Sequence, residues 1–305
     1  MFSIDKCKLM FLDSLRLHRN CSYNTIISYR TDLDQFISFF RGIKGDNDFP
    51  ITSVDGVCIS QFKDELIYKG LKTSTVSRKM TALRTFFRFL LREKMIEANP
   101  MLFIINPAVT RSSDREISLR NIEQAIESIP KDTFIGVRDR AILEVFYGGG
   151  IRLGELVNLK LADLDLKSGL MFVGKKKKDG RITPIGKPAI EAITEYIRLR
   201  YCLVKELEVQ GVPEALFLAI NAKPLSRRSV QERVYEGLCR VVDIRAFNPN
   251  ILRQSFKAHL LNSGADVNSV RYMLGQVVTS SLNSPPERSI EELIQVHCKA
   301  HPRSN

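Results

Sequence analysis

Apolar side chains recur at intervals of three and four residues along two long stretches of this chain, residues 26–40 and residues 76–91. Because an α-helix turns once every 3.6 residues, this spacing gathers the apolar side chains on one face, which must be buried against a partner. Less regular apolar runs over residues 9–17 and 59–67 can supply the partners. The four stretches together predict a helical bundle of about 100 residues, the size of a small domain.

A second helical part follows a break in this periodicity. Asn-Pro occurs twice between residues 99 and 107, and Ser-Ser follows at 112–113. These dipeptides are typical of turns and loops. We therefore expect one domain over residues 1–104, a linker over 105–116 and a second domain over 117–305. The helices predicted in the second domain are 117–129, 137–147, 153–159, 188–201, 226–241, 251–263, 267–274 and 290–296.

Between residues 170 and 185 the pattern changes to that of a β-hairpin. Leu-Met-Phe-Val (170–173) and Arg-Ile-Thr-Pro-Ile (181–185) flank a short polar stretch. Pro184 has no backbone N–H to donate, which predicts that the second strand lies at the edge of its sheet. The expected fold class is therefore mainly α, with a small β-hairpin or sheet.

The chain carries an excess of positive charge in both halves. It has 46 Lys and Arg against 34 Asp and Glu, a net charge of +12, and residues 1–104 hold 16 basic and 11 acidic residues. Such a balance favours a polyanionic partner, because neutralised phosphates supply much of the affinity in DNA binding. On charge alone, a basic but unrelated enzyme stays equally open.

The cysteine pattern and the chain start exclude several classes of protein. The six cysteines are scattered without a CxxC pair, so we expect reduced thiols and neither a zinc site nor a disulfide framework, and no metal or cofactor. Charged residues interrupt every apolar run near the start, which excludes a signal peptide, and no stretch approaches the roughly 18 apolar residues of a membrane span. We expect a cytoplasmic protein.

Two clusters of basic residues are candidates for contact with phosphates. The first lies on or near the face opposite the apolar stripe of the predicted helix 74–94. A basic face that contacts only water would have the same sequence pattern. The second follows Gly174 at the hairpin turn, where adjacent lysines repel one another and favour a polyanion, although an exposed turn fits too. A lysine there could also donate a proton to a leaving oxygen. The members are Arg78, Lys79, Arg84 and Arg88 on the helix, and Lys175, Lys176, Lys177, Lys178 and Arg181 on the hairpin.

Two further arginines each stand near the start of a predicted helix. Arg152 lies in Gly-Ile-Arg-Leu-Gly-Glu-Leu (150–156), and Arg253 follows Asn250-Ile251-Leu252. Two guanidinium groups that converge on a phosphate would bind its oxygens and stabilise charge that develops during phosphoryl transfer. Either arginine alone is more simply interpreted as a structural ion-pair residue.

Taken in this order, the segments resemble the tyrosine recombinase or phage integrase family, closest to its Xer branch, over nearly the whole chain. The resemblance is carried by Gly-Val-Arg-Asp-Arg-Ala-Ile-Leu (136–143), the arginine box at 150–156, the Gly-Lys hairpin, Leu-Arg (252–253) with His-Leu-Leu-Asn-Ser-Gly-Ala-Asp (259–266), Met-Leu-Gly (273–275) and the ending from residue 289. It implies a SAM-like core-binding domain and a catalytic-type domain that close on double-stranded DNA. It also implies a homo- or hetero-oligomer on DNA, with an active Xer-type recombinase as one such partner, and a last helix that docks onto a neighbouring subunit.

The resemblance also assigns roles to single residues. Arg152 and Arg253 match the two catalytic arginines, and Lys175 matches the lysine that protonates the leaving 5′-hydroxyl, with Lys176 as a competitor because the hairpin is one residue longer than usual. Asn250 stands where the family has a histidine, and Gln276 stands where it has histidine or tryptophan. An amide can bond to a phosphate oxygen but cannot act as a general acid or base.

The family's nucleophilic tyrosine is missing. Counted from Met-Leu-Gly or backwards from the ending, its position falls on Pro285, and no tyrosine follows Tyr272. Tyr272 sits inside a helical pattern and is expected to pack, and the nearby serines 280, 281 and 284 have no adjacent histidine base. We therefore expect a DNA-binding protein that is defective in cleavage. Two alternatives stay open: a recombinase that uses a non-standard nucleophile or one from a partner subunit, and a modulator that docks onto an active recombinase.

Overall fold

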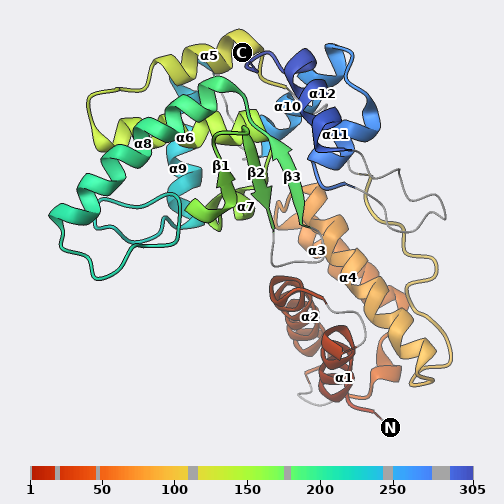
Figure 1. The fold of residues 1–305 in the computed structure, drawn as a ribbon. Helices are drawn as coiled ribbons and strands as arrows, with labels where there is room; N and C mark the ends of the chain where they lie inside the picture. Colours follow the sequence, from red (N-terminus) through yellow and green to blue (C-terminus); the bar gives the residue numbers. More distant parts are fainter. Residues whose placement is uncertain are drawn as a thin grey trace. The chain divides into compact units, whose positions relative to one another are not determined.

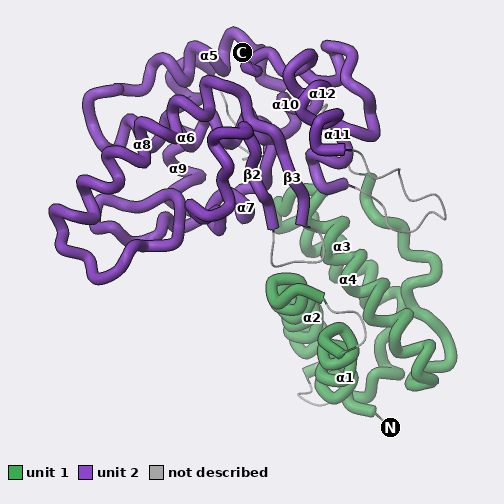
Figure 2. The backbone as a smooth tube through the Cα atoms, viewed as in Figure 1, with its two compact units in different colours: residues 1–111 green, residues 112–305 purple. Residues whose placement is uncertain are grey.

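The computed structural model describes residues 2–17, 21–45, 49–108, 116–174, 180–242, 250–276 and 289–304 (Figure 1). The chain forms two compact units, Met1–Arg111 and Ser112–Asn305 (Figure 2). Helices make up most of the described part and one small sheet accompanies them, which confirms the predicted fold class. None of the helices described in these ranges is long and apolar enough to cross a membrane.

The first unit consists of the expected helices. They are α1 (Ile4–Leu17), α2 (Tyr23–Lys44), α3 (Gly56–Tyr68) and α4 (Thr73–Arg92), with a short 3-10 turn η1 (Ile51–Ser53) between α2 and α3. The Ser22 hydroxyl accepts a hydrogen bond from the backbone N–H of Thr25, which fixes the start of α2. The apolar faces meet in a core of phenylalanine rings, in which Phe11 and Phe86 pack edge to face with centroids 5.4 Å apart.

The second unit is built around one buried helix. Its elements are α5 (Leu119–Glu127), α6 (Phe134–Gly149), α7 (Leu153–Val157), the 3-10 turn η2 (Leu161–Asp163), α8 (Lys187–Glu206), α9 (Arg227–Cys239), α10 (Asn250–Asn262), α11 (Val267–Met273) and α12 (Ile290–Ala300). Helix α6 contacts α8, α9 and α10, and the rings of Phe146 and Tyr147 at its C-terminal end are fully buried. The core of this unit is therefore continuous across its helices.

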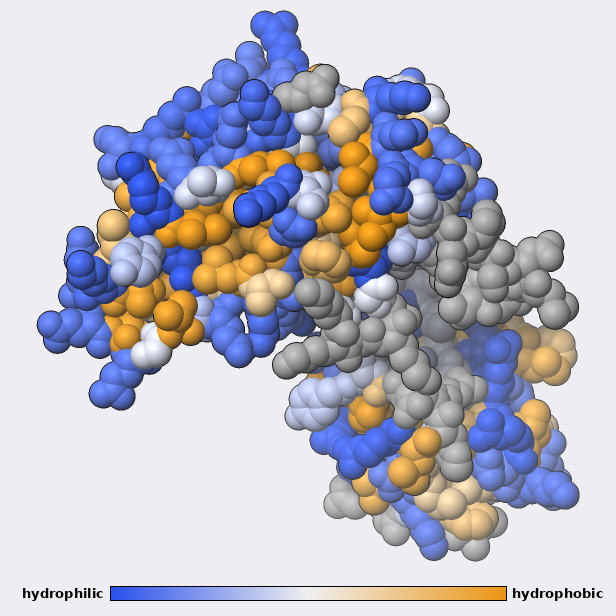
Figure 3. All heavy atoms as spheres, viewed as in Figure 1, coloured by the Kyte–Doolittle hydropathy of each residue, from blue (hydrophilic) through white to orange (hydrophobic). Residues whose placement is uncertain are grey.

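The sheet of the second unit contains the predicted hairpin and one strand that was not predicted. Strands β1 (Leu164–Asp165), β2 (Leu170–Val173) and β3 (Arg181–Pro184) are antiparallel in the order β1-β2-β3. Pro184 pairs with Leu170 on the edge strand β3, as predicted from its missing N–H. Strand β1 has two residues, too few to show an alternating pattern. On the face shown in Figure 3, apolar side chains gather over this sheet and hydrophilic ones surround them.

The last helix packs onto its own unit. Helix α12 contacts β3, α10 and α11, and it buries Leu293, His297 and Ala300. The chain then turns back against Gly186, where a Cβ atom would lie 1.9 Å from the Arg303 carbonyl oxygen. A glycine is therefore required for this close approach. Helix α12 is therefore part of the core of the second unit. Its docking onto a neighbouring subunit, which the family resemblance implied, stays a prediction.

Candidate nucleic-acid interface

Arg152 lies at the surface at the start of α7. The preceding turn is made by Gly150, whose φ of +54° favours glycine. The backbone N–H of Arg152 donates to Glu155 Oε2 at 2.7 Å, and its guanidinium donates to Glu155 Oε1 at 2.9 Å and to the Gly275 carbonyl at 3.3 Å. Nearly half of the side chain, 47%, stays exposed. The guanidinium is thus oriented by its own helix turn while one side faces solvent.

Arg253 is buried beside it on α10. Its guanidinium donates to the Gly150 carbonyl at 2.7 Å and also to the Leu274 carbonyl. Burial, and then the positive charges of Arg152 and Arg181, lower the pKa of Arg253 to about 10, so the group is still charged at neutral pH. An anion bound near these arginines would stabilise their charged forms. The two arginines predicted to bind phosphate are therefore brought together.

Glu155 links Arg152 to a third arginine. Arg181 donates through both terminal nitrogens to the two carboxylate oxygens of Glu155, each at 2.9 Å, and through Nε to the Met273 carbonyl at 2.5 Å. Burial alone would raise the pKa of Glu155, but hydrogen bonds from Arg181 and Arg152 and the Arg181 charge lower it to about 2. Arg181, which was predicted to contact DNA, is buried and bonds to Glu155 and Met273 instead of presenting its guanidinium to solvent.

Of the substituted positions, two lie close to these arginines in the chain. Asn250 is exposed at the start of α10, one helical turn before Arg253. Gln276 is exposed directly after Leu274 and Gly275, whose carbonyls accept from Arg253 and Arg152. Tyr272 is half-buried and packs against the core of the second unit, as expected. Four predicted lysines, Lys175, Lys176, Lys177 and Lys178, and also Pro285, lie outside the described residues.

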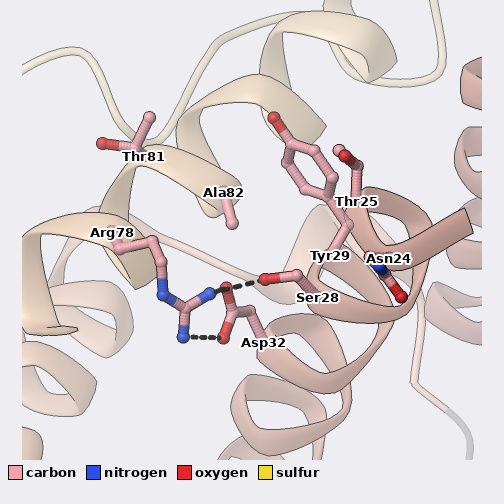
Figure 4. Close-up of a pocket in the computed structure, with 8 residues that line it drawn as sticks. All are labelled: Asn24, Thr25, Ser28, Tyr29, Asp32, Arg78, Thr81 and Ala82. Atoms are coloured by element: carbon pink, nitrogen blue, oxygen red, sulfur yellow. Dashed lines mark hydrogen bonds and ion pairs between the residues drawn. The ribbon is translucent and has the colours of Figure 1, made fainter. Parts of the chain in front are cut away.

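The basic face of α4 is only partly exposed. Figure 4 shows Arg78 reaching across to α2, where it donates to Ser28 and to both carboxylate oxygens of Asp32 beside a pocket of about 370 Å³. Lys79 is buried instead, and it donates to Asp32 at 2.8 Å and to Gln35 at 2.6 Å. Lys79, which was predicted to contact DNA, therefore lies in the interface between α2 and α4, where it pairs with Asp32.

The other two predicted residues of α4 differ in exposure. Arg84 is half-buried and donates to the Asn106 side chain at 2.8 Å and to the Ile104 carbonyl at 2.5 Å, which ties the segment after α4 to the helix. Arg88 is exposed on the same helix. Arg78 and Arg88 are thus the predicted arginines of α4 that present most charge to solvent.

The chain is similar to known integrases in sequence and in fold. Residues 116–283 match the phage integrase family, and residues 10–94 match the phage integrase N-terminal SAM-like domain. The tyrosine recombinase XerC of Natranaerobius thermophilus is 35% identical, with 97% of this chain and 98% of that protein covered. The XerC of Pelotomaculum thermopropionicum is 34% identical over 96% and 97%.

Solved structures show the same fold at low sequence identity. A lambda integrase tetramer bound to a Holliday junction superposes with a TM-score of 0.64 at 16% identity, over 96% of this chain and 81% of that one. The Tn1549 transposon integrase in complex with a circular intermediate DNA superposes with a TM-score of 0.68 at 16% identity, over 95% and 94%.

Proposed function

This chain belongs to the phage integrase family of tyrosine recombinases, and from that membership we propose that it binds double-stranded DNA without cutting it by itself. The observation that carries the proposal is the pairing of two retained phosphate-binding arginines with a proline at the nucleophile position. Arg152 and Arg253 lie together with Arg152 half-exposed, whereas the family's tyrosine position falls on Pro285. Binding requires only positioned charge, but covalent cleavage also requires a nucleophile.

The relatives support further features of the proposal. A lambda integrase tetramer on a Holliday junction shares the fold, which leads us to expect this chain to act as an oligomer on DNA. Its partners would be further copies or an active Xer-type recombinase. Lys175 or Lys176 would add to phosphate binding at the hairpin, and Asn250 and Gln276 would contribute amide donors. The scattered cysteines without a CxxC pair, which are typical of reduced thiols, are the reason that we place the protein in the cytoplasm.

The test is covalent trapping on a nicked duplex that carries sites recognised by XerC relatives. We expect native gels to show retarded DNA and denaturing gels to show no protein–DNA adduct, with an active XerC relative as the positive control. Arg152→Met should weaken binding about tenfold, because one charge-assisted phosphate contact is lost. Arg228→Met removes an equal charge from an exposed residue of α9 and should change binding by about twofold or less.

Each other result has a distinct meaning. A covalent adduct would show that the chain is an active recombinase with a non-standard nucleophile, or with one from a partner subunit. Duplex DNA that is not retarded at low salt would remove the binding proposal altogether. Equal binding by Arg152→Met and the unsubstituted protein would show that the retained arginines no longer contact phosphate.

A second prediction concerns the first unit. Arg78→Met should weaken duplex binding by about threefold to tenfold and reduce the slope of log Kd against log salt by about 0.9, because one exposed cation near the DNA is lost. The free energy of unfolding should fall by only about 1 kcal/mol, since Asp32 keeps its bond to Lys79. Anisotropy titrations and urea unfolding measure the two effects. An unchanged salt slope would place Arg78 away from DNA.

A further inference from the structure

One carboxylate lies among three arginines in the second unit. Glu155 accepts hydrogen bonds from Arg152 and Arg181, and Arg253 is near enough for its pKa to respond to both arginines and to Glu155. The two arginines that bond to Glu155 differ in exposure, since the Arg152 side chain is 47% exposed and that of Arg181 is 4% exposed. Arg181 is therefore closed off from a duplex by the protein, while Arg152 faces outward.

The geometry shows what Glu155 would do without Arg181. A carboxylate binds a guanidinium most strongly when both oxygens accept from its two parallel N–H groups. Arg181 occupies Glu155 in this bidentate manner, so the Arg152 guanidinium bonds to Oε1 only. With Arg181 absent, both carboxylate oxygens would be available to the Arg152 guanidinium, although Oε2 would still accept from the Arg152 backbone N–H. The positive charge of Arg152 would then be neutralised inside the protein and withdrawn from a phosphate.

Arg181 also fixes the turn that holds the other two arginines. Its Nε donates to the Met273 carbonyl, the residue before Leu274 and Gly275, which accept from Arg253 and Arg152. Gly275 has a φ of +60°, and a Cβ atom there would lie 3.1 Å from the Arg181 guanidinium. The guanidinium therefore packs directly against this turn. The Met273 carbonyl also accepts from the Thr183 hydroxyl at 3.4 Å, so the turn keeps a side-chain donor when Arg181 is replaced.

We propose that Arg181 is a positioning residue for phosphate binding, which holds Glu155 so that Arg152 keeps its charge available to DNA. This inference rests on the proposed DNA binding through Arg152 and deepens it. Arg181 itself makes no DNA contact. Its effect is electrostatic and is transmitted through one carboxylate, so removal of that carboxylate should compensate for its loss.

The test is a double-mutant cycle in the full-length protein, with anisotropy titrations of a short mixed-sequence duplex over a salt series. Arg181→Met should weaken binding about tenfold, as Arg152→Met does, and lower the salt slope by about 0.9. Adding Glu155→Gln to Arg181→Met should restore affinity to within about threefold of the unsubstituted protein and return the slope to its original value.

The controls separate positioning from structural damage. The double variant lacks both members of the buried pair, so it leaves no unpaired buried charge and should fold even if Arg181→Met is unstable. Arg200→Met removes another buried arginine of this unit, which donates to the backbone carbonyls of Pro213, Ala215 and Leu216. It should lower the unfolding midpoint without changing the salt slope.

Two outcomes overturn the inference in different ways. If the double variant binds as weakly as Arg181→Met, Arg181 either contacts DNA itself or serves only the fold, and the compensation through Glu155 is refuted. If Arg152→Met binds like the unsubstituted protein, the phosphate contact of the proposed function fails, and the role of Arg181 fails with it.

Discussion

Arg303→Met is expected to lower the free energy of unfolding by about 3–5 kcal/mol, the cost of leaving a buried charge without its partner. Arg303 donates to the carboxylate of Glu144 at 2.5 and 3.2 Å, and Glu144 is only 1% exposed on α6. Burial raises the pKa of Glu144, and Arg303 opposes that rise. Without the arginine, the carboxylate must be either protonated or left uncompensated in the core.

Urea unfolding followed by circular dichroism measures this loss. Adding Glu144→Gln to Arg303→Met should recover most of it, because an uncharged amide has a much smaller desolvation cost. Arg228→Met is the matched control, since its ion pair with Glu232 is exposed and should be worth about 0.5 kcal/mol or less. A loss below about 1 kcal/mol for Arg303→Met would mean that the Glu144 site is accessible to water.

The second unit is also expected to lose about 3 kcal/mol of stability between pH 6.5 and pH 5. His297 and His301 are buried and stacked with ring centroids 4.6 Å apart. Burial lowers the pKa of His297 to about 4. The pKa of His301 is lowered well below 6.5, mainly by burial and in addition by the positive charges of His297, His259 and Arg303. An unfolded histidine titrates near 6.5, so the unfolded state binds more protons across this window. Stability therefore falls as the pH falls.

Unfolding curves at a series of pH values give the slope, which should approach about 1.4 kcal/mol per pH unit for each histidine. His301→Phe keeps a ring against Tyr147 and Phe256 but cannot titrate, so it should remove about half of the slope. Stability that is flat from pH 7 to pH 5 in the unsubstituted protein would show that neither histidine is buried in solution.

Much of the fold follows from periodicity, because an amphipathic helix records its buried face in the spacing of its apolar residues. The stretches at 26–40 and 76–91 lie within α2 and α4, and the hairpin strands 170–173 and 181–184 form as expected. Helix α12 extends four residues beyond the predicted 290–296, and its extra turn carries His297 and Ala300, which are buried against the rest of the unit. Tertiary packing extends this helix, and a local pattern does not contain that information.

The burial of charged residues follows less directly from the sequence than the burial of apolar ones. Spacing puts Lys79 and Arg181 among exposed cations, but each is buried because a carboxylate distant in the sequence, Asp32 or Glu155, pairs with it. Such pairs depend on which helix faces meet. The bond from the Arg152 backbone to Glu155 could have been predicted from the sequence. Glu155 stands three residues after Arg152 at a helix start, which is the spacing at which a glutamate accepts from the backbone N–H of the capping residue.

Arg152 and Arg253, the two arginines proposed to bind phosphate, are held largely by backbone groups of two turns. Arg253 bonds to the carbonyls of Gly150 and Leu274, and Arg152 bonds to that of Gly275 in addition to Glu155. Every residue type supplies a backbone carbonyl, so substitutions along these turns leave the acceptors in place as long as the turns keep their shape. If the proposed phosphate contact is made here, its geometry depends on the shape of two turns and not on the identity of their side chains, so it can persist while the side chains around it diverge.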